Sequence, residues 1–260
     1  MTEQLQLDFD KIIKTSNISK KDIDLKRNYL EKFIESGFPN RKQENWKFLD
    51  ISQIIKKNIG DLSFFNDYSL PNKIDTSIFV NSLEHNKIIF INGRIEKIDF
   101  NFEDQEKIEI RDEIEKKITF NYDNSLIDLN KAFTNKILKI VIKKGYSLKK
   151  PLIIYHTTSE NIESKNINSR IDFELEQNSS LKLIDFYVDK ADKIFTNILY
   201  NFVLNNDSAL KNYKIDKSKN NNLKYSFNNI EQGENSVSET FILSAGSNFF
   251  KNEINCNLTG

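Results

Sequence analysis

Residues 173–187 read FELEQNSSLKLIDFY, and the pattern of residue types in this stretch predicts the fold of much of the chain. A β-prone run leads into a polar turn that ends in Ser or Ala, one aliphatic residue follows, and a second β-prone run begins. The same plan recurs in three further stretches, spaced about 30 residues apart. They are VIKKGYSLKKPLIIY (141–155), FVLNNDSALKNYKI (202–215) and NIEQGENSVSETFIL (229–243).

One aliphatic residue occupies the shared place in each stretch, and we expect the four to stack in the protein interior. Repeated β units without intervening helices favour a β-solenoid, in which each coil covers the apolar face of its neighbour. A β-sandwich is the alternative, because its strands also alternate with polar turns. The solenoid predicts parallel strands and burial of Leu148, Leu181, Leu210 and Val237.

The beginning of the chain follows a helical pattern instead. Ser19 with Asp22 resembles a capping box, and Gly37 is a typical helix end. Asp50 is placed to begin a further short helix, and residues 124–135 show helical spacing within the later part of the chain. We therefore predict a set of capped helices that precede the repeats.

The pattern changes to β after residue 80, beginning with a hairpin. Two apolar runs flank Asn92-Gly93, a pair that favours a two-residue hairpin turn. The chain has only 7 Gly and 3 Pro but many Asn, so Asn is expected at left-handed turn positions elsewhere. The predicted organisation is a helical N-terminal region, residues 1–80, followed by a mainly β core domain, residues 81–260.

Residues able to bind a metal ion or act as nucleophiles are scarce. The chain has 1 Cys and 2 His, whereas structural zinc or an iron–sulfur cluster usually needs about four such ligands. Cys256 alternates with Ile254 and Leu258, which favours a packed apolar role over that of a ligand or nucleophile. His85 and His156 are interpreted as surface or hydrogen-bonded histidines. Neither glycine-rich phosphate-binding motif is present, and we predict no catalytic, cofactor-binding or metal-binding residue.

Charge and the N-terminal sequence restrict the classes of partner. Lys and Arg together number 38, as do Asp and Glu, so the formal net charge is +0. Nucleic acids and anionic membranes attract clustered positive charge, and neither is an expected partner. No apolar run is long enough to span a membrane. The polar start of the chain and its single Cys favour a cytoplasmic location.

Residues 37–52, GFPNRKQENWKFLDIS, resemble the N-terminal signature of the SufB/SufD family of iron–sulfur cluster assembly proteins, and in particular its SufD branch. The signature contains Gly, Pro, two basic residues, Glu, Trp, a basic residue and an aromatic residue in this order. Residues 88–95, 130–156 and 195–215 are similar to further family segments. Trp46 is interpreted as an anchor of the helices on the solenoid, with Arg41 and Glu44 paired one turn apart.

The resemblance implies a right-handed parallel β-helix and a non-enzymatic role. On this basis the full-length protein is a scaffold subunit that pairs with a SufB-like paralogue and a SufC-like ATPase. No cofactor is expected on this chain alone, while an iron–sulfur cluster is bound transiently in the full complex. Family members continue with more coils beyond the position of Gly260, so the solenoid is expected to be incomplete at its C-terminus.

Two other functions stay open at this point. A polysaccharide-acting β-helix enzyme resembles the chain in coil architecture only; such enzymes are typically secreted and gather carboxylates on one solenoid face. A generic solenoid interaction module, with no link to iron–sulfur chemistry, also agrees with the repeat.

Overall fold

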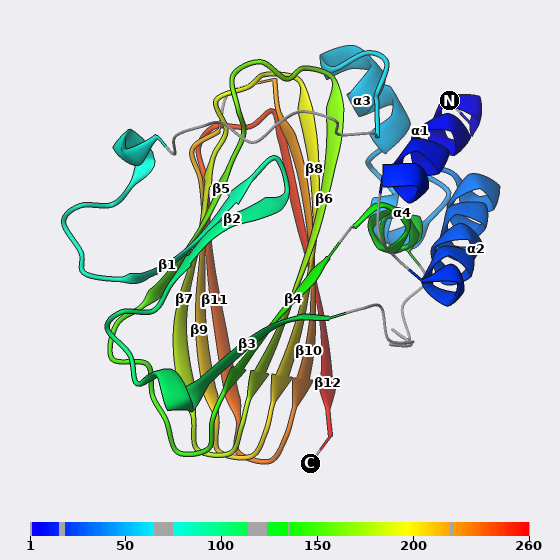
Figure 1. Cartoon of the computed structure of the whole chain (residues 1–260). Helices are drawn as coiled ribbons and strands as arrows, with labels where there is room; N and C mark the ends of the chain where they lie inside the picture. Colours follow the sequence, from blue (N-terminus) through cyan, green and yellow to red (C-terminus); the bar gives the residue numbers. More distant parts are fainter. Residues whose placement is uncertain are drawn as a thin grey trace.

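Two six-stranded sheets form the body of the protein, and a group of helices lies on the outer side of one of them (Figure 1). The computed structural model describes residues 2–15, 19–64, 75–113, 124–134, 136–218 and 221–259. The predicted helical region includes residues 65–74 and the predicted solenoid includes Gly260, and both of these lie outside the described residues.

The first sheet, called here the β11 sheet, has the strand order β11-β9-β7-β5-β1-β2. All of its neighbouring strands are parallel except β1 and β2. Its strands are β1 (Asn86–Ile91), β2 (Arg94–Asp99), β5 (Leu152–Thr157), β7 (Ser180–Val188), β9 (Ala209–Asp216) and β11 (Val237–Ser244).

The second sheet, called here the β12 sheet, has the order β12-β10-β8-β6-β4-β3, and only β3 and β4 are antiparallel. Its strands are β3 (Ile108–Glu113), β4 (Ile137–Ile142), β6 (Lys165–Leu175), β8 (Ile194–Leu204), β10 (Leu223–Gln232) and β12 (Phe249–Leu258). From β4 onward the chain visits the two sheets alternately, so each consecutive pair of strands makes one coil. Parallel pairing between coils confirms the solenoid and rules out the antiparallel sandwich for these strands.

In each coil, the turn that leads from the β12 sheet to the β11 sheet contains one residue with a left-handed backbone conformation. The residues with positive φ are Gly145 (72°), Asn178 (58°), Asp207 (59°) and Asn235 (54°). The N–H groups of the first three donate to carbonyls of the next coil, at Gln177, Asn206 and Glu234. Asn and Asp tolerate this conformation better than other residues with a Cβ. The expectation that Asn replaces Gly in turns is confirmed here.

The register of the coils corrects one of the four stacking predictions. Leu181 pairs with Leu210, and both are 1% exposed, while Leu148 is half-buried in the same interior cluster. Val237, however, is 50% exposed, because Leu210 pairs with Ser238 and Val237 pairs with Ala209. A shift of one residue along a strand moves a side chain to the opposite face. The prediction that Val237 is buried was therefore wrong.

The two positions make a matched pair for a stability test. Leu210→Ala is expected to lower the free energy of unfolding by about 2–5 kcal/mol, because it leaves a cavity between coils. Val237→Ala is expected to change it by less than about 0.5 kcal/mol, since the side chain is largely in solvent. Urea unfolding followed by circular dichroism measures both, and equal losses would contradict the register.

The predicted hairpin is present between β1 and β2. Asn92 and Gly93 both have positive φ, at 54° and 77°, and Ile91 pairs with Arg94 across the turn. A Cβ atom on Gly93 would lie 2.7 Å from Cγ2 of Ile167. Gly93 is needed both for the turn and for this close approach.

The predicted start and end of α2 and the predicted start of α3 are confirmed. Ser19 Oγ accepts from the N–H of Asp22 at 3.3 Å, and the Asp50 carboxylate caps α3 through the N–H of Gln53 at 3.1 Å. The helices are α1 (Thr2–Thr15), α2 (Lys20–Ser36), α3 (Ile51–Asn58) and α4 (Ser125–Phe133), and the 3₁₀ segments are η1 (Glu44–Trp46), η2 (Thr76–Ile78) and η3 (Gln105–Lys107). Gly37 follows α2 with φ 67°.

The helices pack on the outer face of the β12 sheet (Figure 1). Asn130 on α4 donates to the carbonyls of Ser169 and Asn197, at 3.0 and 2.8 Å, and so joins the helix to β6 and β8. Helices and strands share one apolar core. Its strand residues are Phe195, Leu199, Leu223, Tyr225 and Phe227.

Trp46 anchors the N-terminal region on this face, as predicted. Its side chain is 3% exposed, and its ring lies 5.8 Å from that of Tyr225 on β10. The Lys251 ammonium of β12 lies 4.6 Å from the indole ring and donates to the carbonyl of Asn45 at 3.0 Å. The basic residues around Trp46 are therefore solvent-facing, while the indole faces the strands. The expected Arg41–Glu44 ion pair is not among those formed in the described part of the chain.

Trp46 and the neighbouring Phe48 provide a second matched comparison. Trp46→Ala is expected to cost about 3–5 kcal/mol of unfolding free energy, because it removes a large buried side chain at the helix–sheet junction. Phe48 is 84% exposed, so Phe48→Ala should be close to neutral. Thermal unfolding monitored by circular dichroism tests both variants, and a neutral Trp46→Ala would remove the anchoring role.

Candidate functional site

His85 occupies a buried position ahead of β1. Its Nδ1 lies 2.7 Å from the carbonyl of Leu83, and its Nε2 lies 2.9 Å from the hydroxyl of Tyr155. Both ring nitrogens are thus engaged within the fold. The interpretation of His85 as a hydrogen-bonded histidine is confirmed.

Cys256 differs from its prediction. It faces the interior of the solenoid on β12, in line with Ile230 and Phe202 of the two preceding coils. The thiol is nevertheless exposed, because β12 is the last strand described in its sheet and no described coil covers it. Cys256 Sγ lies 2.9 Å from Oε1 of Gln232. The strand face was predicted correctly, but burial was not.

His156 is part of a polar network inside the solenoid. Its ring is stacked between those of Phe90 and Tyr187, at centroid distances of 5.3 and 4.8 Å. Nε2 lies 3.2 Å from Oδ1 of Asp185 and 3.0 Å from the hydroxyl of Tyr200, which also donates to Asp185. An ionised carboxylate only accepts hydrogen bonds, so Nε2 carries the proton.

Asp185 is paired with Lys214 in the coil above it. The two residues are in register, and Lys214 Nζ donates to Oδ2 of Asp185 at 2.6 Å with both side chains 0% exposed. Burial alone raises the pKa of Asp185, but Lys214 and His156 outweigh it and lower the pKa to about 2. Burial lowers the pKa of Lys214 despite the attraction of Asp185. At neutral pH this is an ion pair held out of water.

Burial and the charge of Asp185 also act on the two neighbouring phenols. They raise the pKa of Tyr187 and of Tyr200 well above the usual value, so both stay protonated. The Lys214 ammonium lies 4.1 Å from the centroid of the Tyr200 ring. The ammonium is therefore stabilised by an aromatic face as well as by the carboxylate.

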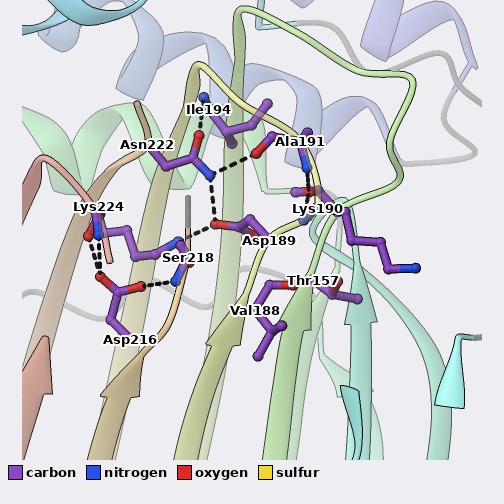
Figure 2. A network of polar contacts seen from close by, with 12 residues as sticks. Thr157, Val188, Asp189, Lys190, Ala191, Ile194, Asp216, Ser218, Asn222 and Lys224 are labelled. Atoms are coloured by element: carbon purple, nitrogen blue, oxygen red, sulfur yellow. Dashed lines mark hydrogen bonds and ion pairs between the residues drawn. The ribbon is translucent and has the colours of Figure 1, made fainter. Parts of the chain in front are cut away.

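A second polar cluster lies at the corner where the coils pass from the β11 sheet to the β12 sheet (Figure 2). Lys224 Nζ donates to the Asp189 carboxylate, and Asn222 Nδ2 donates to the same oxygen at 3.3 Å. Asn222 Oδ1 accepts from the N–H of Ile194 at 2.9 Å, and its Nδ2 donates to the Ala191 carbonyl at 3.0 Å. Asn222 thereby joins one corner to that of the preceding coil.

Asp216 organises the next corner in the same way. Its carboxylate accepts from the N–H groups of Ser218 and Ser247, at 3.0 and 3.3 Å, and from the Ser244 hydroxyl at 3.2 Å. Burial raises the pKa of Asp216, but Lys224 and the serine donors outweigh it, so the pKa is lowered overall. These contacts hold a carboxylate ionised between two turns.

Both clusters are suited to fixing the stacking of the coils. Their charged groups are buried and paired within the chain, and they lie away from solvent. Buried ion pairs need not add stability over an apolar core, but a misaligned coil would leave their charges unpaired at a high cost. Within the described residues, no group of three or more His, Cys, Asp or Glu side chains is arranged to hold a metal ion.

The end of the solenoid opposite the β1–β2 hairpin has a different character. β11 and β12 are the outermost strands there, and each is paired on one side only within the described residues. Their interior-facing residues Ile242, Ile254 and Leu258 are exposed. A further coil of the same solenoid would cover these edges and side chains.

The coils that carry both clusters and this end lie in a single segment of the sequence. Residues 155–260 match the SufBD core domain. The family model is described as SUF system FeS cluster assembly, SufBD core domain, and the match supports the SufB/SufD family and a role in Suf iron–sulfur cluster assembly. Strands β6–β12 all lie inside the SufBD core match. Comparison with curated proteins finds no match. None of the helices in the described residues is long and apolar enough to cross a membrane.

The sequence contained a signal for the buried ion pair that our site prediction missed. When SLKLIDFY (180–187) is aligned with ALKNYKID (209–216) on their shared Leu, Asp185 falls opposite Lys214 at an interior position. Opposite charges at matching places of neighbouring coils indicate a pair. The partnership of His156 with Tyr200 is between sheets, and the repeat alignment does not indicate it.

The Asp185–Lys214 pair predicts a specific dependence of stability on pH. The pKa of Asp185 is lower in the folded than in the unfolded state, so its ionised carboxylate adds to the free energy of unfolding. This contribution is complete above the unfolded pKa and is lost as pH falls toward the folded pKa. Wild-type protein should lose about 2 kcal/mol more unfolding free energy than Asp185→Asn between about pH 5 and pH 2. Urea unfolding at a series of pH values measures this difference.

The same variants separate pairing from burial. At neutral pH Asp185→Asn leaves Lys214 without its carboxylate and should cost about 3–5 kcal/mol. The double variant Asp185→Leu/Lys214→Met should recover much of this loss, because no charge is then left unpaired. Parallel pH profiles for wild type and Asp185→Asn would contradict the assignment.

Proposed function

We propose that this chain is a non-catalytic scaffold subunit of the Suf iron–sulfur cluster assembly machinery, which pairs with a SufB-like paralogue and a SufC-like ATPase in the cytoplasm. The observation that carries the proposal is the match of residues 155–260 to the SufBD core domain. That segment forms the regular coils and the unpaired strands β11 and β12. Residues 37–52 add the resemblance to the SufD branch within the family.

The architecture supports a scaffold role in physical terms. Coils stacked in register, with buried ion pairs and a helical layer held by Trp46, make a stiff body that presents strand edges at one end. In the full-length protein, the resemblance implies that further coils cover this end and meet the SufB-like partner.

Iron and sulfur are the cargo in this proposal, and the cluster is held only in the assembled complex. Both histidines of the chain are engaged in internal hydrogen bonds. The exposed Cys256 is a single thiol, too few to hold a cluster without further ligands. We assign the chain no catalytic residue.

Co-expression with the SufB-like and SufC-like proteins of the same genome tests the proposal. The tagged full-length protein should retain both through size-exclusion chromatography. Residues 1–260 alone should retain both partners poorly, because the segment to which the resemblance assigns the partner contacts is then missing. Phe48→Asp in the full-length protein is the control, since it alters an exposed apolar residue outside the SufBD core match and should leave retention unchanged.

Loss of the gene should also lower the activity of iron–sulfur enzymes in cells that rely on this system. Retention of neither partner, together with unchanged iron–sulfur enzyme activity, would sink the proposal. Cleavage of polygalacturonate by the purified protein would instead favour the polysaccharide-acting alternative.

A further inference from the structure

The outer face of the β11 sheet carries an apolar stripe that runs along the solenoid. Strand register places Ile153, Ile184, Tyr213 and Phe241 in one column, and Tyr155, Phe186, Ile215 and Leu243 in the next. These residues alternate with interior ones such as Asp185 and Lys214, so they point away from the interior. The outer stripe is defined here as Ile184, Phe186, Tyr213, Ile215, Phe241 and Leu243.

A segment of the chain itself already covers the beginning of these columns. Ile78, Phe79 and Val80 pack against a cluster that includes Ile153 and Tyr155, and the first two stripe residues, Ile184 and Phe186, pack against the same cluster. The Phe79 ring lies 5.0 Å from that of Tyr155, and the N–H of Val80 donates to the Tyr155 hydroxyl at 3.0 Å. Aromatic packing and one backbone hydrogen bond thus hold these three residues, the last of η2 and the two that follow it, against the sheet.

Charged contacts secure this covering segment at its start. Asp75 forms an ion pair with Lys190, and Lys190 together with the Ser77 N–H lowers the pKa of the Asp75 carboxyl below its usual value. The covering segment therefore consists of an acidic residue followed, three residues later, by three apolar residues.

The outer stripe continues past the covering segment with the same chemistry. Tyr213 is 38% exposed although β7 and β11 flank it, and Phe241 is 56% exposed. Their rings lie 6.4 Å apart, so the two form a continuous aromatic surface. Lys182 and the Lys211–Glu239 ion pair lie along one border of the stripe and give it a charged rim. An apolar centre with a charged rim is typical of protein-binding surfaces.

We propose that the outer stripe binds a short apolar segment of a partner polypeptide, which packs on β7, β9 and β11 as residues 78–80 pack on β1 and β5. Continuity with the covered columns identifies this type of occupant: two or three consecutive apolar residues, one of them aromatic, with an acidic residue close by, as Asp75 is close to residues 78–80. The stripe is a lateral face of the solenoid, distinct from the strand edges of β11 and β12. It does not depend on the Suf assignment.

A peptide with the sequence of residues 75–82, DTSIFVNS, is the probe. Fluorescence anisotropy of the labelled peptide with the whole chain should show saturable binding. Tyr213→Asp and Phe241→Asp should each weaken it by about tenfold, the usual effect of removing one aromatic contact and adding a charge. A peptide with Ile78→Ser, Phe79→Ser and Val80→Ser should not bind.

Phe48→Asp is the matched control, because it changes an exposed aromatic residue on the helical side and should leave binding unchanged. Melting curves verify that the variants fold, and Phe241→Ser provides a milder change should a charged variant be unstable. Absence of saturable binding, or equal loss with Phe48→Asp, would overturn the proposal. A concentration-dependent dimer that Tyr213→Asp dissociates would overturn it too, since a second copy would then cover the stripe.

Discussion

In-register stacking of the coils is the constraint on which the rest of the structure depends. Parallel strands of adjacent coils lie about 4.8 Å apart, so each side chain meets the side chain at the same place in the next coil. Each column must therefore be chemically compatible along its length. The interior meets this condition with Leu181 over Leu210 and with Asp185 over Lys214. The outer face meets it with a ladder in which Asn255 donates to Asn229 at 2.8 Å and Asn229 donates to Asn201 at 2.9 Å.

Apolar and charged columns contribute differently to this stacking. An aliphatic column is favourable in several registers, because one buried Leu is much like another. A buried carboxylate tolerates only a neighbour that neutralises it. The Asp185–Lys214 pair and the Asn222 bridge between corners thus select one arrangement among the compact alternatives that the aliphatic columns would permit. Stability and specificity of the fold rest on different columns.

Local signals in the sequence predicted most of the architecture, and the errors have physical causes. The caps of α2 and α3, the Asn92-Gly93 hairpin and the coil repeat depend on neighbouring residues, so they were predicted correctly. The sequence comparison matched Val237 with Leu210, because each follows the small residue that ends the turn, Ser236 or Ala209. The turns have equal lengths, however, and the resulting register places Ser238 opposite Leu210.

The polar interior was harder to predict. His156 meets Tyr200 across the solenoid, and His85 meets Tyr155 from a different segment, so neither contact has a local signature. Exposure of Cys256 depends on whether another coil follows, and alternation along a strand carries no information on that. The alternation of side chains along a strand defines the face on which a residue lies, whereas the next coil determines whether that residue is buried.

The contact of Trp46 with the late strands also orders events during synthesis. The indole packs on Tyr225, and Asn45 accepts from Lys251, 206 positions further along the chain. The N-terminal helices therefore leave the ribosome long before their docking surface exists, and they must keep an apolar face in water, or on a chaperone, during that interval. Translation proceeds at about 5–20 residues per second, which makes this wait about ten seconds or longer. The fluorescence of the only tryptophan thus reports the docking of the N-terminal helices on β10 and β12, and it distinguishes a chain whose coils have formed from one whose helices have also docked.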